Sequence, residues 1–167
     1  MKSTALLACE KIIIEKEGTH SIINVMLRLN VSLEQQASSE CEESMPIPAK
    51  AVLPSQWWIY TVWVPSADNI GETFEQVYQL FWPNGEKYAE TRLQPFTQND
   101  ESPQQTTFFF IGLPIGQEGR MRIVTWLDSN GHCVTEICET FLEIRHGIPD
   151  HLKSNISGLI NVGALHS

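Results

Sequence analysis

Two histidines and one cysteine are the side chains of this sequence best suited to hold a metal ion. His20 and His132 each lie beside a predicted turn, and Cys133 directly follows His132. Turns at one end of a β domain can converge, so these side chains could supply the nitrogen and thiolate ligands that zinc prefers. The C-x-x-C spacing of structural zinc sites is absent, and turn histidines and a small buried thiol explain the same residues without metal. We therefore expect no cofactor, and a metal-dependent enzyme is the weakest alternative.

Carboxylates and serines offer no recognisable catalytic arrangement. Glu139 and Glu143 share one face of the last predicted strand, while Arg120 and Arg122 share one face of the strand before it. Because side chains on neighbouring strands pair across a sheet, these residues predict cross-strand ion pairs rather than an acid–base site. The G-x-S-x-G motif of a nucleophilic serine does not occur in the sequence. We therefore expect that the chain is not an enzyme.

Five tryptophans could provide stacking surfaces for a ligand. A flat aromatic face can stack on a sugar or another small molecule, and a β-sandwich that binds such a ligand is the alternative function. Large aromatic residues are also highly buried on average, and in a core they would be out of reach of a ligand. The tryptophans are Trp57, Trp58, Trp63, Trp82 and Trp126.

Length, charge and composition restrict the class of protein. The 167 residues are 42% hydrophobic and 19% charged, which is typical of a folded chain, and their number predicts one domain. Eleven basic and twenty acidic residues give a net charge of −9, which disfavours nucleic-acid binding through charge. No apolar run is long enough to cross a membrane as a helix.

The N-terminal segment has two interpretations. Leu6-Leu7-Ala8-Cys9 resembles the cleavage site of a bacterial lipoprotein. The apolar stretch before Cys9 covers only residues 5–8, whereas a secretory signal needs about 7–15 apolar residues. We therefore favour a first β-strand and a cytoplasmic protein whose four cysteines are reduced thiols.

Alternation of apolar and polar residues is the dominant pattern in the sequence. It is clearest at residues 21–33, where Ile23, Val25 and Leu27 point to one side, as in a half-buried strand. In the last predicted strand, residues 132–145, apolar residues occur in both phases of the alternation, which predicts a bulge or burial on both faces. Short strands and hairpin turns such as Asn84-Gly85 predict an all-β, antiparallel β-sandwich over residues 1–146. About eight strands are expected, at residues 6–16, 21–33, 57–64, 74–82, 86–96, 106–111, 120–128 and 132–145.

Two segments fall outside the strand pattern. Residues 34–56 form a predicted long acidic loop with three prolines, and residues 147–167 form a predicted tail, flexible or briefly helical. Acidic side chains can meet a basic surface, and a short apolar motif can fold onto a groove. We therefore expect a non-enzymatic protein-interaction module, such as an adaptor, regulator or assembly subunit, that binds another protein. Exposed sheet edges are also compatible with a homodimer. The candidate partner-binding residues are Glu40, Glu42, Glu43, Trp57, Trp58, Ile156, Leu159 and Ile160.

Several short motifs resemble a group of known proteins. Residues 7–13 read Leu-Ala-Cys-Glu-Lys-Ile-Ile, residues 112–115 read Gly-Leu-Pro-Ile, and residues 119–123 read Gly-Arg-Met-Arg-Ile. Over residues 4–146 the chain resembles a family of small uncharacterised bacterial β-sandwich proteins. Its members open with a Leu-Ala-x-x strand and have a Gly-x-Pro-x crossing before the last strands. The resemblance implies a cytoplasmic bacterial β-sandwich of unassigned function and transfers no catalytic residue.

Overall fold

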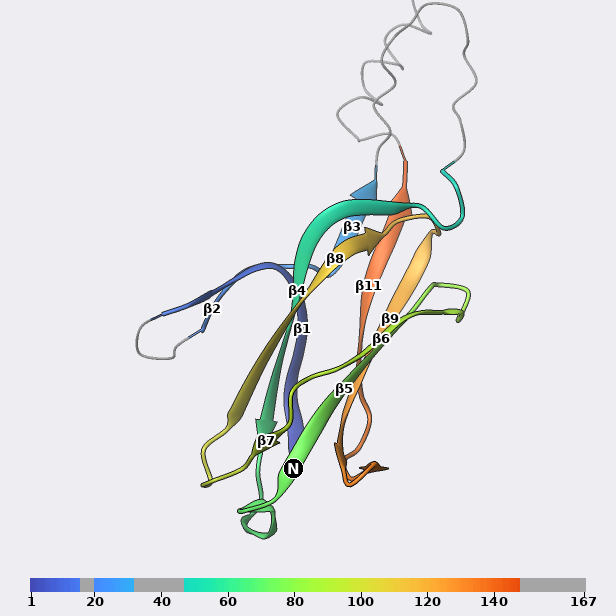
Figure 1. Cartoon of the computed structure of the whole chain (residues 1–167). Coiled ribbons are helices and arrows are strands. Elements are labelled where there is room, and N and C mark those ends of the chain that lie inside the picture. The colour runs from blue at the N-terminus through green and yellow to red at the C-terminus, as the bar shows by residue number, and fades with distance from the viewer. Residues whose placement is uncertain (16–19, 32–46, 148–167) are drawn as a thin grey trace, which may run out of the picture.

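Two β-sheets packed against each other make up the described part of the chain (Figure 1). The computed structural model describes residues 1–15, 20–31 and 47–147. Within these ranges the chain forms eleven strands and one 3-10 turn, η1 (Ala67–Asn69). The prediction of an all-β fold is confirmed for the described residues. The strands outnumber the eight expected because three predicted strands are each divided in two.

The first sheet, sheet A, has four antiparallel strands in the order β2-β1-β4-β8. β1 and β4 are its central strands, and Ala8 of β1 pairs with Ile59 of β4. The edges of the sheet are β2 and β8. The four strands are β1 (Lys2–Ile14), β2 (His20–Val25), β4 (Val52–Val64) and β8 (Gln104–Pro114).

The second sheet, sheet B, follows the order β3-β11-β9-β5-β6, with β10 beside β9 and β7 beside β5. β3 runs parallel to β11, and this pair departs from the predicted antiparallel arrangement. The other pairs of sheet B are antiparallel. Its strands are β3 (Arg28–Val31), β5 (Thr73–Phe81), β6 (Lys87–Arg92), β7 (Phe96–Thr97), β9 (Gly119–Ser129), β10 (His132–Cys133) and β11 (Cys138–His146).

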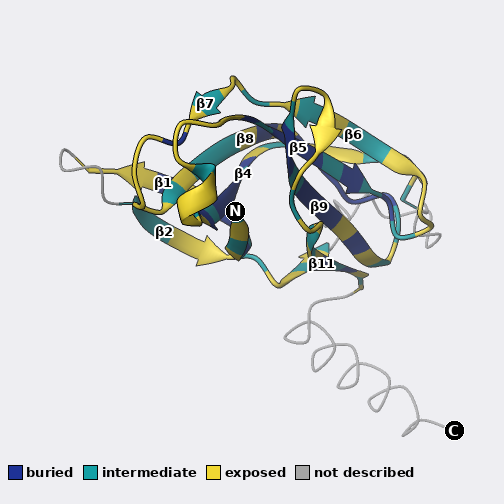
Figure 2. Cartoon of the chain, turned by 90° about the horizontal axis from the view of Figure 1, so that it is seen from below, coloured by how far each residue is buried: buried dark blue, intermediate teal, exposed yellow. Residues whose placement is uncertain are grey.

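The main core lies between the two sheets, where the buried residues of Figure 2 face one another. Alternate residues of β4 point inward, and Trp57 and Ile59 pack in one cluster with Tyr78, Leu80 and Ile123 of sheet B. All five are buried. Burial of a large apolar side chain contributes about 1.5–3 kcal/mol to stability, so this cluster holds the two sheets together.

Polar side chains also cross the interior between the sheets. The hydroxyls of Thr61 and Tyr78 are 2.8 Å apart, and both residues are fully buried. The Thr106 hydroxyl donates to Gln76 Oε1 at 2.5 Å, and Gln76 Nε2 donates to the Thr125 hydroxyl at 3.0 Å. Buried polar groups are costly when they lack partners, so these bonds favour one alignment of sheet A on sheet B.

Sheet A curls over its outer face. His20 at the β2 edge reaches across to β8, where its Nδ1 lies 2.6 Å from Gln105 Oε1. The Tyr60 hydroxyl donates to the same oxygen at 2.8 Å. A second apolar cluster of Cys9, Ile12 and Tyr60 lies beneath this contact, and burial raises the pKa of the Cys9 thiol to about 11. The curl therefore covers part of the outer face and leaves the rest open.

The prediction of one continuous strand at residues 21–33 is wrong, because the described part of this segment forms two strands in different sheets. β2 ends at Val25, β3 starts at Arg28, and Asn24 has a φ of 51°. A left-handed residue interrupts an extended strand, and Asn adopts this conformation more readily than most residues. Leu27, expected to face inward, is exposed at the crossing between the sheets.

The C-terminal end of the predicted acidic loop is a strand. β4 begins at Val52, whereas residues 34–46 of the segment lie outside the described residues. The N–H groups of Ile115 and Gly116 donate to Ala51 O at 2.9 and 3.0 Å. These bonds attach the start of β4 to the turn after β8, which extends the predicted strand by five residues toward its N-terminus.

The last predicted strand, for which a bulge or burial on both faces was expected, is interrupted between β10 and β11 in the manner of a bulge. β10 and β11 both pair with β9, and five residue steps separate Cys133 from Cys138. Only three steps separate their partners Asp128 and Thr125. The surplus residues loop outward and leave Ile137 65% exposed.

Candidate functional site

The residues considered for a metal site lie in different sheets. His20 begins β2 in sheet A, whereas His132 and Cys133 form β10 in sheet B. His20 contacts Gln105 and lies with its ring centroid 5.6 Å from that of Tyr60, and both of these partners are neutral. Within residues 1–15, 20–31 and 47–147, no three His, Cys, Asp or Glu side chains gather as metal ligands. The metal hypothesis therefore gains no support from this geometry.

Arginines pair with the carboxylates of β11. Glu139 Oε2 lies 3.8 Å from Arg122 Nη1, which is one of the predicted cross-strand pairs. Glu143 instead accepts hydrogen bonds from Arg145 and from Arg28, each at 2.8 Å. These bonds lower the pKa of Glu143, and a general acid at neutral pH needs the opposite shift.

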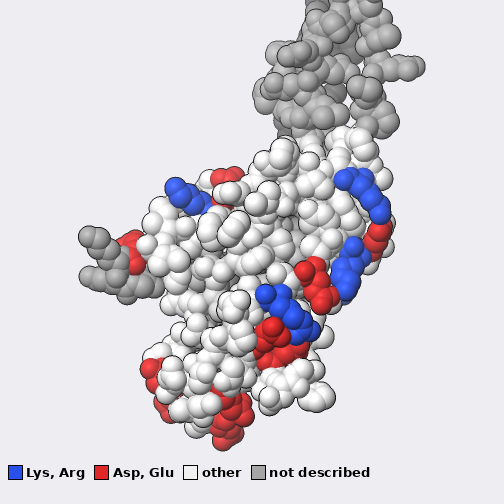
Figure 3. Space-filling view, viewed as in Figure 1, with Lys and Arg blue, Asp and Glu red and all other residues white. Residues whose placement is uncertain are grey.

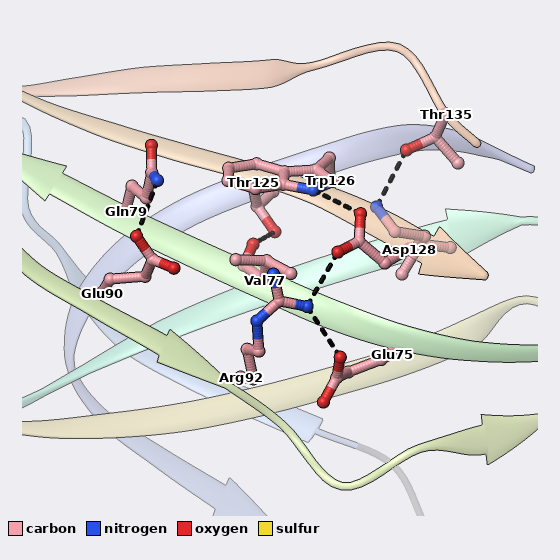
Figure 4. A network of polar contacts seen from close by, with 10 residues as sticks. Glu75, Val77, Gln79, Glu90, Arg92, Thr125, Trp126, Asp128 and Thr135 are labelled. Carbon is pink, nitrogen blue, oxygen red and sulfur yellow. Dashed lines mark hydrogen bonds and ion pairs between the residues drawn. The ribbon is translucent and has the colours of Figure 1, made fainter. Parts of the chain in front are cut away.

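A charged network that we did not predict from the sequence links β5, β6 and β9 (Figure 4). Arg92 Nη1 donates to Glu75 Oε2 at 2.7 Å and to Asp128 Oδ2 at 2.8 Å. The other oxygen of Asp128 accepts a hydrogen bond from Trp126 Nε1 at 2.7 Å. The Asp128 side chain is only 7% exposed, and the bonds to Glu75 and Asp128 raise the pKa of Arg92. Because these side chains find their hydrogen-bond and charge partners within the network, we interpret the network as structural.

Most of the tryptophans lie in the protein interior. Trp57, Trp63 and Trp82 are buried, and the Trp57 indole N–H donates to Gly112 O at 3.0 Å. Trp58 and Trp126 are half-buried and lie in different sheets. The five residues therefore do not form one stacking surface for a ligand.

Trp58 belongs to an exposed apolar patch on the outer face of sheet A. It lies opposite Phe109 of β8, and the two ring centroids are 5.4 Å apart. Phe109 is 44% exposed, and Ile111, on the same side of β8, is 71% exposed. We name Trp58, Phe109 and Ile111 the outer-face patch. It is the strongest candidate site because its apolar side chains meet solvent together.

The two strands that carry this patch are uncharged. Neither β4 nor β8 contains a Lys, Arg, Asp or Glu residue. In Figure 3 the area over these strands is accordingly white, whereas basic and acidic side chains alternate along the neighbouring surface of β5 and β6. On sheet B two aromatic rings lie against an arginine, since Arg122 is 4.4 Å from the Phe81 ring centroid and Arg120 is 5.9 Å from that of Phe141.

The predicted partner-binding residues are only partly placed by the structure. Trp58 lies in the outer-face patch, whereas Trp57 is in the core. The patch residues Phe109 and Ile111 were missed, although the uncharged run at residues 104–115 is visible in the sequence. The remaining candidates, Glu40, Glu42, Glu43, Ile156, Leu159 and Ile160, lie outside the described residues.

Comparisons of the chain with protein-family models and with curated proteins found no match. The described ranges contain no helix of the length and apolar character needed to cross a membrane. The role of the outer-face patch must therefore follow from its own residues, which form an apolar surface on a sheet.

Proposed function

We propose that this chain is a non-enzymatic protein-interaction module, an adaptor, regulator or assembly subunit, that binds another protein through the outer-face patch. The observation that carries the proposal is the joint exposure of Phe109 and Ile111 on an uncharged strand. Exposed apolar side chains that group together mark interaction surfaces, whereas single scattered ones do not.

The patch has a rigid support beneath it. Trp58 packs against the buried cluster of Cys9, Ile12 and Tyr60, and it also contacts the ring of Phe109. A side chain that is held in place before binding loses little rotamer entropy when a partner docks. Aromatic anchors of this kind dominate the binding energy of many protein interfaces.

A small-molecule or carbohydrate site is the alternative function, and the observations favour it less. Ligand sites are concave and bury most of the ligand surface. Phe109 and Ile111 instead project from a sheet face, and Trp57, Trp63 and Trp82 are buried in the core. A protein partner fits an open apolar face better than a sugar does.

We also propose that the module acts in the cytoplasm. Cys9, Cys133 and Cys138 are free thiols, and such thiols persist in a reducing compartment. A domain whose described cysteines form no disulfide relies on its core for stability, which the cluster between the sheets supplies.

Site-specific photo-crosslinking in the native host tests the proposal. A benzophenone amino acid replaces Phe109 in one variant and Phe141 in a matched control, since Phe141 is 40% exposed on the outer face of sheet B. We expect the benzophenone at position 109 to crosslink one protein other than this chain in stoichiometric yield. The benzophenone at position 141 should not crosslink that protein. Mass spectrometry of the adducts identifies the captured peptide.

Two results would contradict the proposal. Equal capture of the same proteins at both positions would show that the outer-face patch is not selective. Adducts at position 109 that contain only peptides of this chain would show contact between copies and no protein partner of a different kind.

A further inference from the structure

β8 is an edge strand without the features that usually prevent edge-to-edge pairing. It is 11 residues long, and one side of it lies against β4 while the other has no strand partner in the described ranges. Natural edge strands are protected by charged side chains, by proline, by bulges or by being short. Residues 106–111 of β8 contain no charge and no proline, and their pairing with β4 is continuous.

The other edges carry such protection. β6 contains Lys87, Glu90 and Arg92, and β3 is only 4 residues long and starts at Arg28. β2 is 6 residues long, and the left-handed φ of Asn24 interrupts it. Among the described strands, β8 therefore offers the longest unprotected row of backbone donors and acceptors.

We propose that β8 pairs antiparallel with β8 of a second copy of this chain. The two 4-stranded sheets then form one sheet of eight strands with a twofold axis near Phe109. The pairing uses residues 106–111, because the His20 contact with Gln105 brings the β2 end of the sheet close to the start of β8. Backbone hydrogen bonds across the axis supply the specificity of strand addition.

Charge favours a second copy as the occupant of this edge. A chain with a net charge of −9 repels its own copies over most of its surface. Residues 106–111 carry no charge, so at this edge two copies approach without like charges opposite each other. Apolar residues of the two strands, Phe109 and Ile111 among them, lie side by side on the outer face. β8 of a second copy thus matches β8 in both its lack of charge and its apolar character.

Pairing of β8 between two copies does not depend on the protein partner proposed above. Dimerisation through β8 brings the outer-face patches of two copies together on one continuous sheet. The combined face is wider than either patch alone, and the partner protein remains able to dock on it. A dimer without a partner protein, or a partner protein bound to a monomer, would separate the two proposals.

Sedimentation equilibrium of the full chain over a wide concentration range tests the dimer. We compare the wild type with Ile111→Lys on β8 and with Ile137→Lys on the bulge, where exposure is similar at 71% and 65%. A lysine on an edge strand opposes pairing with another edge, so Ile111→Lys should raise the dimer Kd at least about tenfold. Ile137→Lys should leave it unchanged. Thr107→Lys, further along β8, should act like Ile111→Lys.

Hydrogen exchange locates the interface at the strand. In the dimer, the outward-pointing amides within residues 106–111 should be protected, and this protection should disappear on dilution and in Ile111→Lys. Added salt should strengthen the dimer, because ions screen the repulsion between two acidic copies. A protein that stays monomeric at all concentrations would overturn the proposal. So would a dimer insensitive to both lysines on β8, or open-ended growth into polymers.

Discussion

The Thr61 hydroxyl of β4 lies 2.8 Å from the Tyr78 hydroxyl of β5, and the bond joins sheet A to sheet B inside the core. Both residues are fully buried, so neither hydroxyl exchanges this partner for water. Apolar packing alone tolerates small sliding of one sheet on another, whereas a buried hydrogen bond with a fixed length does not. The alignment that places the outer-face patch therefore depends partly on polar atoms.

Removal of the Tyr78 hydroxyl should destabilise the fold. Tyr78→Phe leaves the Thr61 hydroxyl buried without this partner, so we expect the free energy of unfolding to fall by about 1–3 kcal/mol. Tyr88→Phe is the control, because its hydroxyl is half-buried and Gly112 O keeps its bond from Trp57. Urea unfolding measures both. Equal losses in the two variants would contradict the special role of the Thr61–Tyr78 bond.

Stability should decline at alkaline pH. Burial raises the pKa of Cys9 from 9.0 to about 11 and that of Tyr78 from 10.0 to about 12. Below pH 9 both groups keep their protons in the folded and unfolded chains, so their contributions are fully present. Above pH 9 the unfolded chain loses protons first, and the contributions are lost as the pH rises toward 12. Urea midpoints across this range should fall in the wild type and fall less in Cys9→Ala/Tyr78→Phe.

Asp128 should contribute to stability through hydrogen bonding and charge together. Asp128→Ala leaves the Trp126 indole N–H without its acceptor, so we expect a loss of about 1–3 kcal/mol in unfolding free energy. Asp128→Asn keeps an oxygen for Trp126 but removes the negative charge beside Arg92. The Asn variant should therefore lose less than the Ala variant in thermal or urea unfolding. An Asn variant as unstable as the Ala variant would assign the whole effect to the charge.

Gly116 should not tolerate a side chain. A Cβ atom there would lie 2.5 Å from three backbone atoms, Pro48 O, Ala49 O and Ala51 N. Gly116→Ala must displace backbone, so we expect a loss of about 1–3 kcal/mol in unfolding free energy. Gly147→Ala is the matched control, since no atom of the described residues lies within 4 Å of its Cβ position, and it should change stability by less than about 0.5 kcal/mol. A neutral Gly116→Ala would mean that the loop before β4 moves aside freely.

Much of the strand content follows from alternation, but the assignment of strands to sheets does not. The pattern at residues 21–33 runs unbroken through the point where the chain leaves sheet A for sheet B. Asn24 is the only local sign of that break, because a left-handed φ favours Asn. The bulge before β11, in contrast, disrupts the alternation itself and could be predicted.

Of the three residues of the outer-face patch, only Trp58 was anticipated from the sequence. Trp57 and Trp58 are adjacent on one strand, so only one of them can face outward, and two identical side chains give no basis for choosing. The same ambiguity applies to residues 108–111, where four apolar residues occupy both phases. Of these four, Phe109 and Ile111 are exposed, because they point outward on an edge strand, and strand order depends on contacts distant in the sequence.

The parallel pairing of β3 with β11 has a consequence for the timing of folding during synthesis. Arg28 and Glu143 are 115 residues apart in the chain, yet they lie side by side. A ribosome that adds about 5–20 residues per second needs roughly 6–23 s to cover that distance. For this interval β3 has no strand partner among the described residues, because β11 is its only neighbour in the sheet. One edge of sheet B is therefore completed only when residues 138–146 have left the ribosome, so the chain must stay unaggregated for most of its own translation.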